Sequence, residues 1–98
     1  MTAPIGAAQQ STVFIPAIED FVAGRSTAEE FEMRYLRLVR DTPGVFDREV
    51  SAAVNRLFSD VDAFVSEDRL RDEEDLDEQQ LLASARVALI ELTRLRDA

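Results

Sequence analysis

Carboxylates are the side chains of this sequence that could do chemistry, and they are gathered in one stretch. Ten of the 20 Asp and Glu residues lie between Asp60 and Glu78, where only Arg69 and Arg71 oppose them. The chain has a formal net charge of −9 at pH 7, so the sequence outside this stretch is almost neutral. So negative a surface repels nucleic acid and attracts a basic partner. The stretch therefore predicts a partner with a basic surface.

The remaining composition removes most catalytic chemistry. The sequence contains no Cys and no His, and all 11 of its basic residues are Arg. Thiolate nucleophiles, the usual zinc sites, imidazole bases and lysine Schiff bases are therefore excluded. Catalysis would depend on carboxylates, hydroxyls or the single Tyr. We expect a protein that is not an enzyme and that has no metal site and no cofactor.

Two carboxylate chemistries can be compared with the spacing of the acids. Asp60 and Asp62 open like a calcium-binding EF-hand loop, but the positions that need Gly and a bidentate Glu hold Val65 and Arg71. Paired-carboxylate hydrolysis needs a sugar-sized cleft, for which a short helical chain offers no obvious place. A solvated loop that only favours solubility stays open, as does weak buffering of divalent ions. Clustered like charges repel one another, which favours a binding surface.

Amphipathic helices are predicted to position the acidic stretch, because apolar residues recur at intervals of three and four along most of the chain. The first helix is expected to follow a frayed segment at residues 1–11, with Pro16 near its first turn and Gly24 just past its end. The second is expected to begin at Ser26 or Thr27, because each has a Glu three residues later, as in a capping box.

The acidic stretch is expected to join the third helix to the fourth. The third helix begins near Asp47, an N-cap residue, and buries an apolar stripe that includes Phe58. The fourth begins at Asp77, which has capping-box spacing with Gln80. Between them, residues 66–76 are expected to form an ordered loop or a short helical turn. The four predicted helices cover about residues 12–23, 27–40, 47–65 and 77–96.

These elements predict an all-α fold, an antiparallel four-helix bundle, in a single domain over residues 1–98. No period of two typical of strands competes with the helical pattern. The third and fourth helices are expected to dominate the core.

Two groups on the second predicted helix are assigned to structure. Tyr35 lies on the apolar stripe, which predicts a core residue with a hydrogen-bonded hydroxyl. Arg34, Arg37 and Arg40 lie three apart on the opposite face. We expect these arginines to form a solvated face paired with Glu30 and nearby acids.

Three segments occur in an order found in a known protein family. Residues 54–64 read VNRLFSDVDAF, the acidic stretch follows, and residues 76–81 read LDEQQL. Upstream, residues 26–31 read STAEEF and are followed by Tyr35. Over residues 13–92 the chain resembles the colicin D-type immunity proteins, the bacterial self-protective immunity family.

The resemblance implies a small antiparallel four-helix protein that blocks the nuclease domain of a bacteriocin or contact-dependent toxin. In the type example the toxin cuts the anticodon loop of transfer RNA, and acids of the inhibitor occupy the basic cleft for that RNA. Carried over by position, the family's acids fall on Asp62, Glu67 and Asp68. The chain departs from the family at the acids of residues 72–75 and at Ser66, where the family often has proline.

The sequence therefore predicts a cytoplasmic immunity protein that blocks the active site of a cognate ribonuclease toxin, a tRNase of bacteriocin or contact-dependent inhibition type. The alternative is an acidic adaptor or a nucleic-acid mimic that regulates another basic protein. Neither nucleic acid nor a membrane is expected as a partner. Asp77 and Glu78 are interpreted as a helix cap outside the binding surface. The residues expected to bind the toxin are Asp60, Asp62, Glu67, Asp68, Asp72, Glu73, Glu74 and Asp75.

Overall fold

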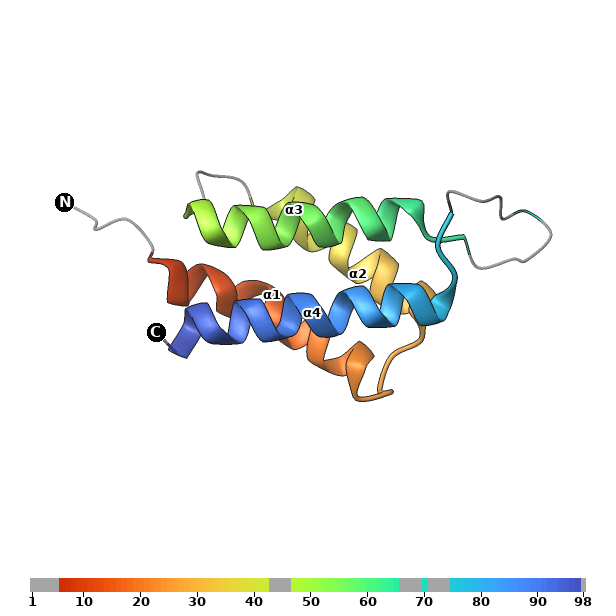
Figure 1. The fold of residues 1–98 in the computed structure, drawn as a ribbon, viewed down its shortest axis with the longest axis horizontal. Helices are drawn as coiled ribbons and strands as arrows, with labels where there is room; N and C mark the ends of the chain where they lie inside the picture. The colour runs from red at the N-terminus through yellow and green to blue at the C-terminus, as the bar shows by residue number, and fades with distance from the viewer. Residues whose placement is uncertain (1–5, 43–46, 66–69, 71–74, 98) are drawn as a thin grey trace.

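Four α-helices account for most of the chain that the structure describes (Figure 1). The structure is a computed structural model, and it describes residues 6–42, 47–65, 70 and 75–97. Within these residues the prediction of an all-α bundle is confirmed, and none of the helices is long and apolar enough to cross a membrane. The helices are α1 (Ala7–Val22), α2 (Ala28–Asp41), α3 (Arg48–Ala63) and α4 (Glu78–Asp97).

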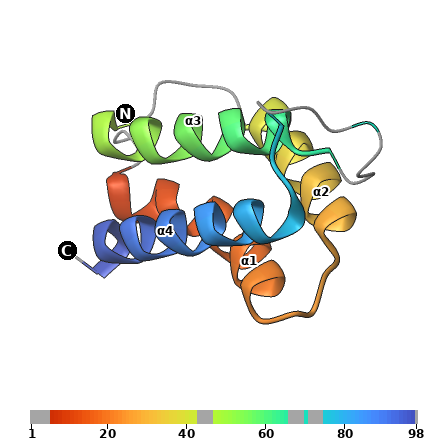
Figure 2. The ribbon, with the colours of Figure 1, turned by 45° about the vertical axis from the view of Figure 1, so that its right-hand side comes forward.

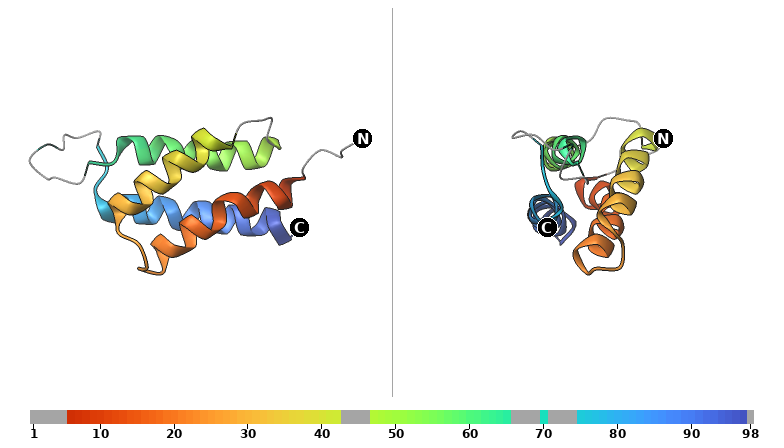
Figure 3. Two further views of the ribbon diagram at one scale, coloured as in Figure 1. Left: turned by 180° about the vertical axis from the view of Figure 1, so that it is seen from behind. Right: turned by 90° about the vertical axis from the view of Figure 1, so that its right-hand side faces the viewer.

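The helices pack in two layers. In the end-on view of Figure 3, α3 and α4 lie on one side and α1 and α2 on the other. The most extensive packing joins α1 to α4 across the two layers, so the expectation that α3 and α4 dominate the core is wrong. The reason is the apolar face of α1, where Phe14, Ile15, Ile18 and Phe21 are all buried.

The start of α1 differs from its prediction. The helix begins at Ala7, so the expected frayed segment does not extend over residues 7–11. Gln10 and Ser11 are buried there. The side-chain oxygen of Gln10 accepts a hydrogen bond from the backbone N–H of Asp47 at 2.7 Å, which ties α1 to the start of α3. This partner is distant in the sequence, so local periodicity could not reveal it.

Pro16 lies in the interior of α1 and not near its first turn. An interior proline removes one backbone hydrogen bond and costs about 3 kcal/mol. The neighbouring side chains Ile15 and Ala17 are both buried, and burial of apolar surface stabilises a fold. Gly24 follows the helix as predicted, with a positive φ of 81° that favours glycine.

The predicted helix caps form at three of the four helix starts. Thr27 and Glu30 make a reciprocal capping box, with hydrogen bonds of 3.1 and 2.9 Å. Asp47 accepts a hydrogen bond from the backbone N–H of Glu49 at 3.0 Å. Ser26, the other predicted start of α2, is not the N-cap. Its buried hydroxyl has no hydrogen-bond partner among the described residues.

The core confirms the assignment of Tyr35 and corrects that of Phe58. Tyr35 is fully buried and its hydroxyl donates a hydrogen bond to the carbonyl oxygen of Val54 at 2.8 Å. Burial raises the pKa of the Tyr35 phenol above its ordinary value. Phe58, expected on the buried stripe of α3, is 37% exposed because its position falls beside the stripe that ends with Leu57 and Val61.

The arginine face of α2 is exposed and pairs with nearby acids as expected, but Glu30 is not one of them. Arg34 forms an ion pair with Asp20 of α1 at 2.6 Å, and Arg40 pairs with Asp41. Glu30 is not the partner, because its side chain accepts the hydrogen bond of the α2 cap.

Candidate functional site at the acidic end

The acidic connection leaves and rejoins the bundle at a base held by backbone hydrogen bonds. Phe64 and Leu76 form an isolated parallel bridge. The N–H of Val65 donates to the carbonyl oxygen of Leu76 at 3.0 Å, and the N–H of Leu76 donates to the carbonyl oxygen of Ala63 at 2.8 Å. Because Phe64 turns into an extended conformation to make this bridge, α3 ends at Ala63 and not at Val65 as predicted. The two ends of the connection are therefore held side by side.

The base of the connection lies at one end of the bundle. The start of α2, the end of α3 and the start of α4 meet at this end, on the right in Figures 1 and 2. The side chain of Phe64 is buried there, whereas Val65 is half-buried. The fold thus presents the residues around this base together, although they come from three helices.

Three of the predicted site residues fall within the described part of the chain. Asp60 and Asp62 lie on the last turn of α3, where Asp62 is exposed and Asp60 half-buried, and Asp75 is half-buried beside the bridge. Within the described residues, no ion pair engages Asp60 or Asp62. The predicted site residues outside the described part of the chain are Glu67, Asp68, Asp72, Glu73 and Glu74.

The structure adds two acids of α2 to this end of the molecule. The pKa of Glu32 lies above its ordinary value, chiefly because burial penalises its charge and then because Glu29 and Asp62 are near it. Packing of α2 against α3 therefore places Glu29, Glu32 and Asp62 near one another. The sequence interpretation missed Glu29 and Glu32, because they precede the acidic stretch by a whole helix and their nearness to Asp62 depends on tertiary packing.

We call these described carboxylates the acidic end. All of them come from α2, from the last turns of α3 or from the residue beside the bridge. Ionised carboxylates accept charge-assisted hydrogen bonds from arginine and lysine. The residues of the acidic end are Glu29, Glu32, Asp60, Asp62 and Asp75.

Asp77 is engaged in a helix cap, as the sequence predicts. Its side chain accepts a hydrogen bond from the backbone N–H of Gln80 at 2.8 Å, and the Gln80 side chain accepts one from the N–H of Asp77 at 2.9 Å. Glu78 follows in the first turn of α4, where the helix dipole favours a negative charge. The interpretation of Asp77 as a cap is therefore confirmed.

The geometry of the acidic end suits recognition of a basic surface. In the part of the chain that the structure describes, no three carboxylates are close enough together to hold a metal ion. The described carboxylates come from two helices and from the residue beside the bridge. What they offer is several negative charges at one end of a small bundle.

Comparison with known families gives one match. The sequence model of the family described as bacterial self-protective colicin-like immunity matches residues 10–92. This segment runs from the first turn of α1 to near the end of α4 and includes the whole acidic end. No curated protein and no solved structure matches the chain.

Proposed function

We propose a specific toxin-blocking role for this chain, which belongs to the bacterial self-protective colicin-like immunity family. Membership makes it an immunity protein against a bacteriocin toxin, and such proteins are inhibitors and not enzymes. The role that we propose is more specific than family membership alone. The protein acts in the cytoplasm, where its acidic end and the adjoining connection block the active site of a cognate ribonuclease toxin, a tRNase of bacteriocin or contact-dependent inhibition type.

The observation that carries this proposal is the joining of Glu32 and Asp62 from two helices into one negative surface. A cleft that binds RNA must present cations to phosphates, so it is complementary to such a surface. The pKa of Glu32 is raised chiefly by burial, and the like charges of Glu29 and Asp62 near it add repulsion. Cations of a partner would relieve this repulsion, so the arrangement favours binding over stability.

The proposed contact residues divide into two roles. Asp62, Glu67 and Asp68 pair directly with cations of the toxin, and the acids of residues 72–75 steer its approach. Removing an acid that is desolvated in the complex costs about 2–5 kcal/mol and acts mainly on dissociation. Removing an acid at the rim changes mainly the association rate and its dependence on salt.

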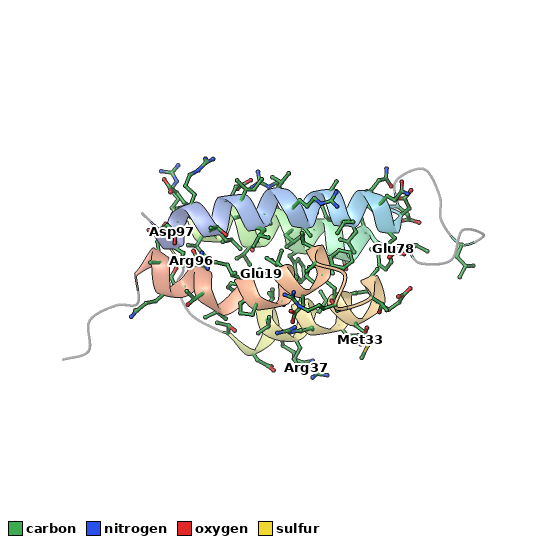
Figure 4. The ribbon with its side chains drawn as sticks, turned by 90° about the horizontal axis from the view of Figure 1, so that it is seen from below. Glu19, Met33, Arg37, Glu78, Arg96 and Asp97 are labelled. Atoms are coloured by element: carbon green, nitrogen blue, oxygen red, sulfur yellow. The ribbon has the colours of Figure 1, made fainter. Side chains whose placement is uncertain are left out.

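Charge reversal with a matched control tests the proposal. Asp62→Arg is expected to weaken binding to the toxin domain encoded beside this chain by about a hundredfold, because the new arginine would face cations of the toxin. Asp97→Arg changes the net charge equally, but Asp97 lies at the other end of α4 from Glu78 (Figure 4) and pairs with Arg96. The control should therefore keep the dissociation rate of the parent, measured by surface plasmon resonance at moderate salt.

Growth protection separates inhibition of a nuclease from binding alone. Cells that express the toxin domain with the parent chain should grow and keep intact transfer RNA, and Asp62→Arg should lose both effects. If the parent binds a basic partner but gives no protection, the adaptor alternative is correct. If Asp62→Arg protects as well as the parent, the acidic end is not the contact surface.

A further inference from the structure

A shallow groove runs between α3 and α4 on the side of the bundle away from α1 and α2. Its volume is about 270 Å³, and its walls include Arg56 and Asp60 of α3 and Ser84 and Val87 of α4. The groove lies between the two helices that face the viewer in Figure 1. The core residues Leu57 and Ala88 also line it.

The α4 wall of the groove is apolar and open. Small residues, Ala83 and Ser84, leave space between the two helices. Val87, the next large side chain in the wall, is 50% exposed, and Ile90, one turn further along α4, is 58% exposed. Both lie outside the buried stripe of α4, so neither contributes to the core. Exposed aliphatic side chains beside a hollow are typical of a contact surface.

The charges at the groove indicate which kind of partner fits it. Asp60 lines the groove and lies two residues before Asp62 on α3, so the groove ends next to the acidic end. Arg56, the groove's cation, is paired with Glu91 of α4. The groove therefore offers an apolar wall beside Asp60, a carboxylate that makes no ion pair with another described residue. Its complement is an apolar side chain with a cation next to it.

We propose that the α3–α4 groove receives an apolar side chain of the same basic toxin domain that the acidic end binds. This inference rests on the proposed function and adds the apolar centre of that interface. Acid pairs at a rim speed association, whereas a buried apolar contact with water excluded around it prolongs the complex. The groove is thus the place where the lifetime of the complex is decided.

The double variant Val87→Ser/Ile90→Ser tests the groove. Its dissociation from the toxin domain encoded beside this chain is expected to be about tenfold faster or more, as for loss of central contacts. The association rate and its salt dependence should stay near those of the parent, because no charge changes. The matched control is Met33→Ser, since Met33 is 63% exposed on α2 and points away from α4 in Figure 4.

The outcomes distinguish this inference from the proposed function. If Asp62→Arg weakens binding while the double variant dissociates like the parent, the groove proposal is overturned and the proposed function stands. If the parent itself does not bind the toxin domain, both are overturned. If sedimentation shows that the parent alone dimerises and that the double variant does not, the occupant is a second copy of this chain and the proposal is wrong. Circular dichroism and melting temperature confirm that each variant is folded before binding is compared.

Discussion

At the scale of single residues, Glu32 is a carboxylate whose surroundings oppose its charge. Its carboxylate is partly buried on α2, where Glu29 and Asp62 add repulsion. These causes raise the pKa of Glu32 above its ordinary value of 4.5. A carboxyl group whose pKa is raised by folding stabilises the fold below its unfolded pKa, and this contribution is lost as the pH rises through the folded value. At neutral pH, ionised Glu32 therefore lowers the free energy of unfolding.

Replacing Glu32 with glutamine tests this account. Glu32→Gln is expected to raise the melting temperature at pH 7, because it removes a poorly solvated charge that faces other acids. The gain should shrink as the pH falls towards 4, where Glu32 of the parent becomes protonated. Thermal unfolding followed by circular dichroism at several pH values measures both effects.

The control for this prediction is Glu19→Gln. Glu19 is exposed on α1, and its charge favours the cationic form of Arg96, so its removal should give no gain. A melting temperature of Glu32→Gln at or below that of the parent at pH 7 would contradict the repulsion between α2 and α3.

At the scale of the helices, local capping decides where each element starts. The cap of α4 is a reciprocal pair of Asp77 and Gln80, and its hydrogen bonds engage an acid that lies within the run of negative charge. Asp77 therefore contributes to stability, although its neighbours in the sequence are proposed to bind the toxin. The boundary between these two roles lies between Asp75 and Asp77, at the bridge made by Leu76.

Substitution of Asp77 separates capping from binding. Asp77→Ala removes the acceptor for the N–H of Gln80 and is expected to lower the free energy of unfolding by about 1 kcal/mol, measured by urea denaturation. Asp77→Asn removes the same charge but keeps a capping oxygen, so its stability should stay near that of the parent. Both variants should keep the toxin dissociation rate of the parent. Faster dissociation of Asp77→Asn would instead place Asp77 in the binding surface.

At the scale of the whole molecule, negative charge is concentrated in one stretch of the sequence while the remainder is nearly neutral. The formal net charge of −9 is distributed so that most of the excess lies between residues 60 and 78. Elsewhere several acids are paired with arginine: Asp20, Asp41, Glu91 and Asp97. We expect repulsion among these clustered acids to oppose folding more than the exposed ion pairs favour it, because exposed ion pairs contribute little.

Added salt should stabilise the protein for this reason. Screening shortens the reach of charge interactions from about 30 Å at 0.01 M to about 8 Å at 0.15 M ionic strength. The melting temperature is expected to rise between these two conditions, as measured by differential scanning calorimetry. Asp62→Arg, which removes part of the repulsion, should show a smaller rise. A fall with salt would mean that the Asp20 pairs dominate the electrostatic balance.

Most of the fold could be predicted from the sequence because the signals are local. The capping box of Thr27 and the cap of Asp77 each depend on residues three positions away, and both formed as expected. The start of α1 could not be predicted in the same way. Gln10 is ordered by the backbone of Asp47, which is close only after the helices pack.

The local features of the candidate site could likewise be predicted from the sequence, and its contacts between helices could not. By itself the sequence determined the family, the all-α architecture and the presence of a concentrated run of acids, because these depend on residue types and short intervals along the chain. Only the tertiary structure decided that Glu29 and Glu32 join Asp62, and that Val87 and Ile90 stay exposed beside a groove that ends at Asp60. These relations join separate helices, and the distance between residues on separate helices is set by packing of the core.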